Sequence, residues 1–60
     1  MIKYFIYEKQ INRVWDSSYT SKQAAIWDLV AHTSKRDRTD SVYQVYHYDN
    51  GRVVIDWCSC

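Results

Sequence analysis

The clearest periodic pattern in the chain lies in residues 20–32, where apolar side chains recur at helical spacing. At about 100° per residue, one side of the helical wheel holds a core stripe of Ala25, Ile26, Leu29 and Val30. Thr20 and Gln23 have the spacing of a capping box, in which the first side chain binds a free backbone amide. The pattern therefore predicts a helix from Thr20 to His32 that packs through one face.

This helix is apolar over more of its circumference than a single sheet contact requires. Its second apolar group is Trp27 with Ala24 and Ala31, and the polar sector holds Asp28 and His32. Trp27 either closes the edge of a small core or anchors a partner, because tryptophan is enriched at binding hot spots.

Two segments before the helix have the composition of β-strands. Residues 2–8 place apolar groups on both faces, with Ile2, Tyr4 and Ile6 on one and Lys3, Phe5 and Tyr7 on the other. Such a strand suits the centre of a sheet. Residues 9–12 form a connection with Asn12 as its turn residue, and residues 13–16 are expected to form a short second strand.

Asn50-Gly51 between two β-rich runs predicts a type I′ hairpin, because both residues tolerate positive φ. Counting outward pairs Tyr46 with Ile55, Val45 with Asp56 and Gln44 with Trp57. One face then carries Tyr46, Tyr48, Val53, Ile55 and Trp57, and we expect it to face the core. The other face carries Tyr43, Val45, His47, Asp49, Arg52, Val54, Asp56 and Cys58.

The predicted order of elements is strand, strand, helix, strand, strand. It indicates one α+β domain over residues 1–60, with an antiparallel sheet of about four strands and one helix packed on one face. Residues 34–40 contain three cations and two acids and are interpreted as a solvated loop. A loop that contacts phosphate is the alternative.

A single helix leaves one face of such a sheet uncovered. We expect that face to hold Tyr43, Val45 and Val54, with either Phe5 and Tyr7 or Ile2, Tyr4 and Ile6. It can bind another protein, pair with a second copy, or be buried by curling of the sheet, and we favour the first two. The predicted partner-binding residues are Trp27, Tyr43, Val45, His47, Val54, Phe5 and Tyr7.

The composition narrows the class of partner. The chain has three Trp, six Tyr and one Phe but a formal net charge of only +1. This balance argues against an acidic DNA mimic and against a strongly basic nucleic-acid binder. A nucleic-acid-binding sheet is the alternative, supported by aromatics interleaved with cations at Lys3, Tyr4, Phe5, Tyr7, Lys9, Arg13 and Trp15.

We expect no catalytic activity, cofactor or metal. His47 and Asp56 share a predicted sheet face, and His32 and Asp28 share the predicted helix. Each pair is typical of a solvated histidine beside an aspartate on a protein surface. The one metal-like set joins these histidines to Cys58-Ser59-Cys60, where the spacing is Cys-x-Cys and not the Cys-x-x-Cys of zinc sites. Free thiols or a partly tethered tail are favoured at Cys58 and Cys60, since a disulfide between them closes a strained ring.

The sequence shows no signal-peptide pattern and no apolar run that could span a bilayer, so we expect a cytoplasmic protein. Tyr19-Thr20-Ser21-Lys22-Gln23-Ala24-Ala25 resembles the strand-to-helix junction of small sheet-plus-helix modules, including integrase-arm domains that read DNA with a sheet. A short chain with an aromatic surface also resembles the small accessory proteins of phages, which often block a host protein. The sequence thus favours a non-catalytic protein-binding module, acting as an inhibitor or modulator.

Overall fold

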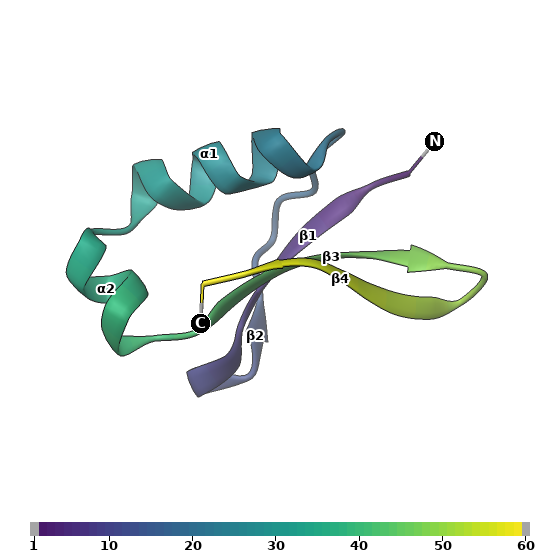
Figure 1. Cartoon of the computed structure of the whole chain (residues 1–60). Coiled ribbons are helices and arrows are strands. Elements are labelled where there is room, and N and C mark those ends of the chain that lie inside the picture. Colours follow the sequence, from purple (N-terminus) through teal and green to yellow (C-terminus); the bar gives the residue numbers. More distant parts are fainter. Residues whose placement is uncertain (1, 60) are drawn as a thin grey trace.

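The computed structural model describes residues 2–59 and forms one four-stranded antiparallel sheet with two helices (Figure 1). The elements are β1 (Tyr4–Glu8), η1 (Lys9–Ile11, a 3-10 turn), β2 (Arg13–Val14), α1 (Lys22–His32), α2 (Lys35–Asp40), β3 (Tyr43–Asp49) and β4 (Arg52–Cys58). The strand order is β2-β1-β3-β4. The predicted α+β class and the central place of the first strand are confirmed.

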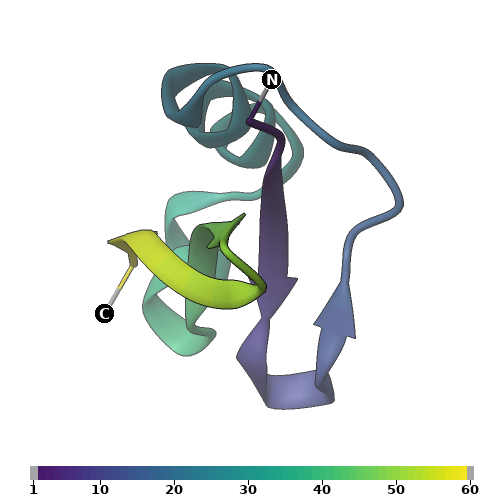
Figure 2. The ribbon, with the colours of Figure 1, turned by 90° about the vertical axis from the view of Figure 1, so that its right-hand side faces the viewer.

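Figure 2 shows β2 on one side of β1 and the β3–β4 hairpin on the other. Asn12 has a φ of 50° at the end of η1, so the predicted turn residue is confirmed. Asn50 and Gly51 have φ values of 51° and 80°, as a type I′ hairpin requires. The second strand is shorter than predicted and covers only Arg13–Val14, although the Trp15 amide also donates to the Ile6 carbonyl at 2.9 Å.

The hairpin contains a bulge that simple alternation does not predict. The expected register holds from the turn to the pair Tyr46 and Ile55 and then shifts by one residue, so that Val45 lies opposite Trp57. Asp56 is the additional residue, and the predicted pairs of Val45 with Asp56 and Gln44 with Trp57 are wrong. Because a bulge redirects the side chains after it, Trp57 lies on the same face as Val45.

The hydrophobic core lies between α1 and the central strands β1 and β3. Ile6, Val45, Ala25 and Leu29 are fully buried there, and Tyr43 is nearly so. Packed around them are the partly buried residues Tyr4, Trp15, Tyr19, Ile26 and Trp57. Thus Ala25 and Leu29 are core residues as predicted.

The core stripe of α1 is narrower than predicted. Val30 is 44% exposed, so its assignment to the core is wrong. A single helix resting on two strands buries one narrow row of side chains, and Val30 lies outside that row.

The predicted orientation of the hairpin is also wrong. Tyr43 and Val45 face the helix and are buried, whereas Tyr48, Val53 and Ile55 are more than half exposed. Both faces of the hairpin carry apolar side chains, and strict alternation placed Trp57 on the wrong one. The bulge returns Trp57 to the helix side, where it packs against the core.

Both helices begin at serine caps. The α1 cap is Ser21, whose side-chain oxygen accepts from the Ala24 amide at 3.1 Å, so the predicted start at Thr20 is one residue early. Helix α2 occupies the segment predicted to be a loop. Ser34 and Asp37 form a capping box there, with each side chain accepting from the other's backbone amide.

Two further contacts fix the segments that flank α1. Tyr4 and Tyr19 exchange backbone hydrogen bonds of 2.8 and 2.9 Å, which attach the connection from β2 to the end of β1. Arg38 of α2 donates to the carbonyl oxygen of Thr33 at 2.8 Å. Within residues 2–59, neither helix has the length and apolar character needed to cross a membrane.

Candidate functional site

The sheet face turned away from α1 is the main exposed apolar surface of the described chain. Cross-strand partners share a face, so the pairs Phe5–Tyr46, Tyr46–Ile55 and Tyr48–Val53 define this side of the sheet. We call it the open face, formed by Phe5, Tyr7, Val14, Gln44, Tyr46, Tyr48, Val53 and Ile55.

An aromatic cluster forms the floor of the open face. The ring centroids of Phe5 and Tyr46 are 5.5 Å apart in a stacked arrangement, and Tyr48 meets both rings edge-on at 5.9 and 5.6 Å. These neighbours leave Tyr46 only 7% exposed, and this burial, with the adjacent Tyr48 hydroxyl, raises the pKa of Tyr46. Interlocked rings give a platform with little side-chain freedom to lose on binding.

A groove of about 280 Å³ crosses this platform. It is lined by Tyr7, Val14, Gln44, Tyr46, Tyr48, Val53 and Ile55, none of which is charged. The rim residues Val14, Tyr48, Val53 and Ile55 are between 43% and 55% exposed. The groove therefore offers an apolar, uncharged contact with three tyrosine hydroxyls and one amide as its polar groups.

The predicted partner-binding residues do not form one surface. Phe5 and Tyr7 lie on the open face as one of the two predicted alternatives stated. The placement of Tyr43 and Val45 on an uncovered face is wrong, because the helix packs directly over them.

The remaining predicted residues lie elsewhere. Val54 and His47 are paired across the hairpin on the helix side of the sheet, and Val54 is 38% exposed. Trp27 is 66% exposed on α1 and therefore does not close the core. Because α1 covers the opposite side of the sheet from the open face, Trp27 forms a separate apolar site.

The most exposed groove residues were recognised in the sequence as one cluster but were assigned to the core. Tyr48, Val53 and Ile55 share a face because of the correctly predicted turn at Asn50-Gly51. No signal in that pattern identified which of two apolar faces the helix would cover. Val14 was missed because a two-residue strand has no periodicity to read.

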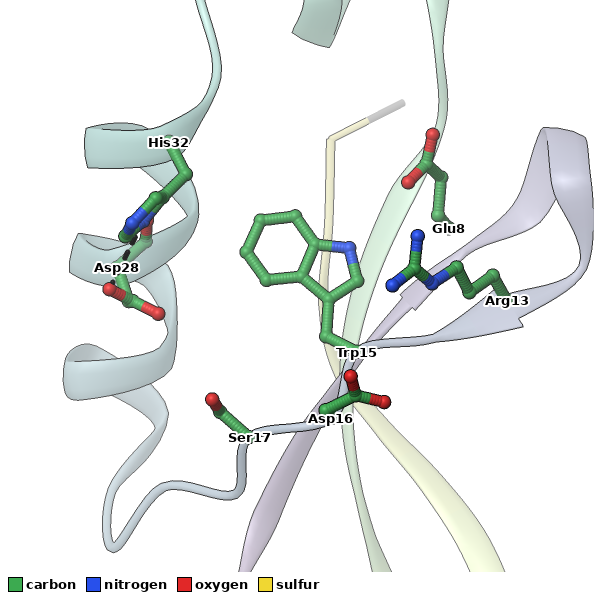
Figure 3. Close-up of a pocket in the computed structure, with 7 residues that line it drawn as sticks. All are labelled: Glu8, Arg13, Trp15, Asp16, Ser17, Asp28 and His32. Atoms are coloured by element: carbon green, nitrogen blue, oxygen red, sulfur yellow. Dashed lines mark hydrogen bonds and ion pairs between the residues drawn. The ribbon is translucent and has the colours of Figure 1, made fainter.

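A second hollow, of about 360 Å³, lies between β2 and α1 (Figure 3). The indole of Trp15 stands in its middle, and the other lining residues are Glu8, Arg13, Asp16, Ser17, Asp28 and His32. The ring of Trp15 contacts the rings of His32 and Tyr43 edge-on, each at 6.3 Å. Because Trp15 also packs against the core, the wall of this hollow is partly continuous with the core.

Asp28 links this hollow to Tyr19 and His32. It accepts a hydrogen bond from the Tyr19 hydroxyl, and its Oδ1 lies 3.2 Å from Nδ1 of His32. Burial and then the Asp28 carboxylate raise the pKa of Tyr19 to about 12. The carboxylate is thus committed to internal contacts that join α1 to the segment before it.

The second predicted histidine pair also forms. His47 Nδ1 donates to Asp56 Oδ2 at 2.6 Å, with both side chains at most one-fifth exposed, which confirms that they share a face. The ring centroids of Tyr4 and His47 are 5.4 Å apart in an edge-on arrangement. In both histidine pairs Nδ1 of the imidazole contacts the aspartate, which fixes the orientation of the histidine ring.

Metal-binding geometry is not found in the described chain: residues 2–59 contain no group of three or more His, Cys, Asp and Glu side chains placed to hold an ion. Of the two cysteines considered for such a site, Cys58 is disulfide-bonded, so the free thiol expected there is wrong, and Cys60 lies outside the described residues. The expected lack of a metal stays a prediction.

Comparison with known proteins finds no relative of this chain. No family model, curated protein or solved structure matches the chain. The function must therefore be inferred from the surfaces themselves, and the open face is the most developed of them.

Proposed function

We propose that this protein is a non-catalytic binding module that docks another protein on its open face and thereby inhibits or modulates it. The observation that supports this most directly is the exposed apolar groove formed by Val14, Tyr48, Val53 and Ile55. Exposed apolar patches on small domains are typical of interaction sites.

The chemistry of the groove specifies the kind of partner. A surface without charge gains little from a charged ligand, so the partner should present aliphatic or aromatic side chains with few charges at the centre of contact. Tyr48 is the best candidate for a dominant contact, because it is 54% exposed and held by Phe5 and Tyr46. A tyrosine ordered in advance contributes contact area at low entropic cost.

A nucleic-acid-binding sheet is the alternative function, since aromatic rings on an open sheet can stack on bases. Two observations weigh against it. The interleaved aromatics and cations are divided between the faces, with Phe5 and Tyr7 on the open face but Tyr4 and Trp15 against the core. The groove itself has no cation to contact phosphate.

The proposal can be tested by capture from a cell lysate followed by mass spectrometry, with variants as the discriminating step. Tyr48→Lys places a charge in the groove and should reduce capture of any specific partner at least about tenfold, as expected for loss of a contact worth 1.4 kcal/mol or more. Gln10→Lys is the matched control, because Gln10 is exposed in η1 and does not line the groove.

A partner whose capture is equally reduced by both variants, or by neither, would contradict the assignment of the open face. Trp27→Ala tests the separate apolar site on α1, and loss of the partner in that variant alone would move the function there. Binding to single-stranded RNA that weakens steeply with salt and is lost in Tyr48→Lys would favour the alternative function.

A further inference from the structure

Strand β4 forms an outer edge of the sheet, and that edge is open. It pairs with β3 on one side, and no other strand within residues 2–59 pairs with it. Its centre is apolar and exposed, with exposed fractions of 55%, 38% and 52% for Val53, Val54 and Ile55. Edge strands in monomeric proteins are usually protected by charges, Pro or a covering segment, and this triplet carries neither charge nor Pro.

The hairpin determines which backbone groups of β4 point outward. In a two-residue turn the carbonyl of the first residue accepts from the amide of the fourth, here Asp49 and Arg52. Inward bonding alternates along antiparallel strands, so Val54 bonds to β3 as well. The amide and carbonyl groups of Val53 and Ile55 therefore point to the outer edge and can pair with another strand.

We propose that two copies of this chain associate by antiparallel pairing of their β4 strands around a two-fold axis at Val54. In this arrangement Val53 lies opposite Ile55 of the second copy, and Val54 faces its own counterpart. The outward backbone groups then bond to each other, as a symmetric pairing requires. The proposal uses the strand edge and does not depend on the proposed function of the open face.

Charge selects this register over its neighbours. With the axis at Val54, Arg52 lies opposite Asp56 of the second copy, and the reciprocal pair forms at the other end. The Asp56 carboxylate already accepts from His47 through Oδ2, so Arg52 would add a second contact to it. Opposite charges that face each other across a ladder stabilise it. An axis at Val53 would place Arg52 opposite Val54, and an axis at Ile55 would place Asp56 opposite Val54. Neither register brings Arg52 opposite Asp56.

The bulge limits the length of the pairing. Asp56 is the additional residue of β4 and interrupts its regular pairing with β3, so the intermolecular ladder is expected to cover Arg52 to Asp56. Five residues form a small interface, and small interfaces are weak. We therefore expect a reversible dimer that is populated only at high protein concentration, with the two open faces joined into one surface.

Sedimentation equilibrium on the full chain tests the proposal over concentrations from about 10 μM to about 1 mM, the range that resolves weak dimers. The apparent mass should rise from monomer toward dimer. Val54→Lys sets two like charges against each other at the axis and should lower the association constant at least about tenfold. Arg52→Asp should also lower it, and more strongly at low salt.

Tyr48→Lys is the control, because it changes the open face on β3 and leaves the β4 edge intact. It should preserve the dimer while removing the docking activity proposed above, so the two proposals can fail separately. Both edge variants alter exposed positions, and an unchanged amide spectrum at low concentration would show that they fold. In a mixture of labelled and unlabelled chains, NOEs between the Val54 methyl groups of two copies should report the axis.

A chain that remains monomeric at every concentration would overturn the proposal. So would a dimer that Val54→Lys and Arg52→Asp leave intact. Association that is abolished by Tyr48→Lys but not by Val54→Lys would place the second copy on the open face and refute edge pairing.

Discussion

Truncation of Leu29 is the sharpest test of how α1 and the sheet fit together. Leu29 is fully buried in the core cluster with Ile6 and Val45. Leu29→Ala should lower the free energy of unfolding by about 2–5 kcal/mol, because the mutation removes buried methyl groups and leaves a cavity. A domain of this length has a total of only about 3–9 kcal/mol. The melting temperature should therefore fall by at least about 8 °C.

Urea unfolding followed by tryptophan fluorescence would measure this change, since Trp15 and Trp57 pack against the same core. Val30→Ala is the matched control, because Val30 is the next residue on α1 but is 44% exposed. It should change the free energy of unfolding by no more than about 0.5–1 kcal/mol.

Equal costs for Leu29→Ala and Val30→Ala would refute the packing described above. The helix would then not rest on β1 and β3 through the side of Leu29. The assignment of the opposite sheet face as open would lose its basis as well.

Three further outcomes are expected. Gly51→Ala should cost about 1 kcal/mol in urea unfolding through its φ of 80° alone, since no atom lies within 4 Å of an added Cβ, and no cost would contradict the turn type. The pKa of Tyr19 is raised from 10.0 to about 12, so its contribution to stability should be constant below pH 10 and lost as the pH rises to 12. The decline in the free energy of unfolding between pH 9 and pH 11 should be smaller in Tyr19→Phe than in the native chain, because the raised pKa of Tyr46 contributes to both. Trp27→Ala should change the free energy of unfolding by less than about 0.5 kcal/mol, and a larger loss would place that ring in the core.

Much of the local structure could be predicted from the sequence because short-range chemistry determines it. Asn50-Gly51 defined the turn, and the register near it followed by counting. The spacing of Ala25 and Leu29 identified the buried row of the helix. Helix α2 was missed because its residues are mostly charged and were interpreted as a solvated loop. The capping box that starts it uses Asp37 in place of the usual Glu or Gln.

The candidate site was harder to predict because it depends on which sheet face the helix covers. That choice is made by long-range packing, and both faces of the hairpin are rich in apolar side chains. The extra residue Asp56 shifts the register, so that Trp57 lies on the helix side of the sheet and packs against the core. A bulge has no reliable sequence signature at an aspartate, so the cluster of Tyr48, Val53 and Ile55 was recognised but assigned to the wrong side.

The strand order has a consequence for biosynthesis. Strand β1 emerges early from the ribosome, but its central neighbour β3 begins only at Tyr43. By then α1 has already been translated and can coil locally, whereas β1 has only the two-residue strand β2 to pair with. Nascent chains should therefore keep β1 exposed until β3 is made, and chaperones that recognise extended aromatic segments would find Tyr4–Glu8 during that interval.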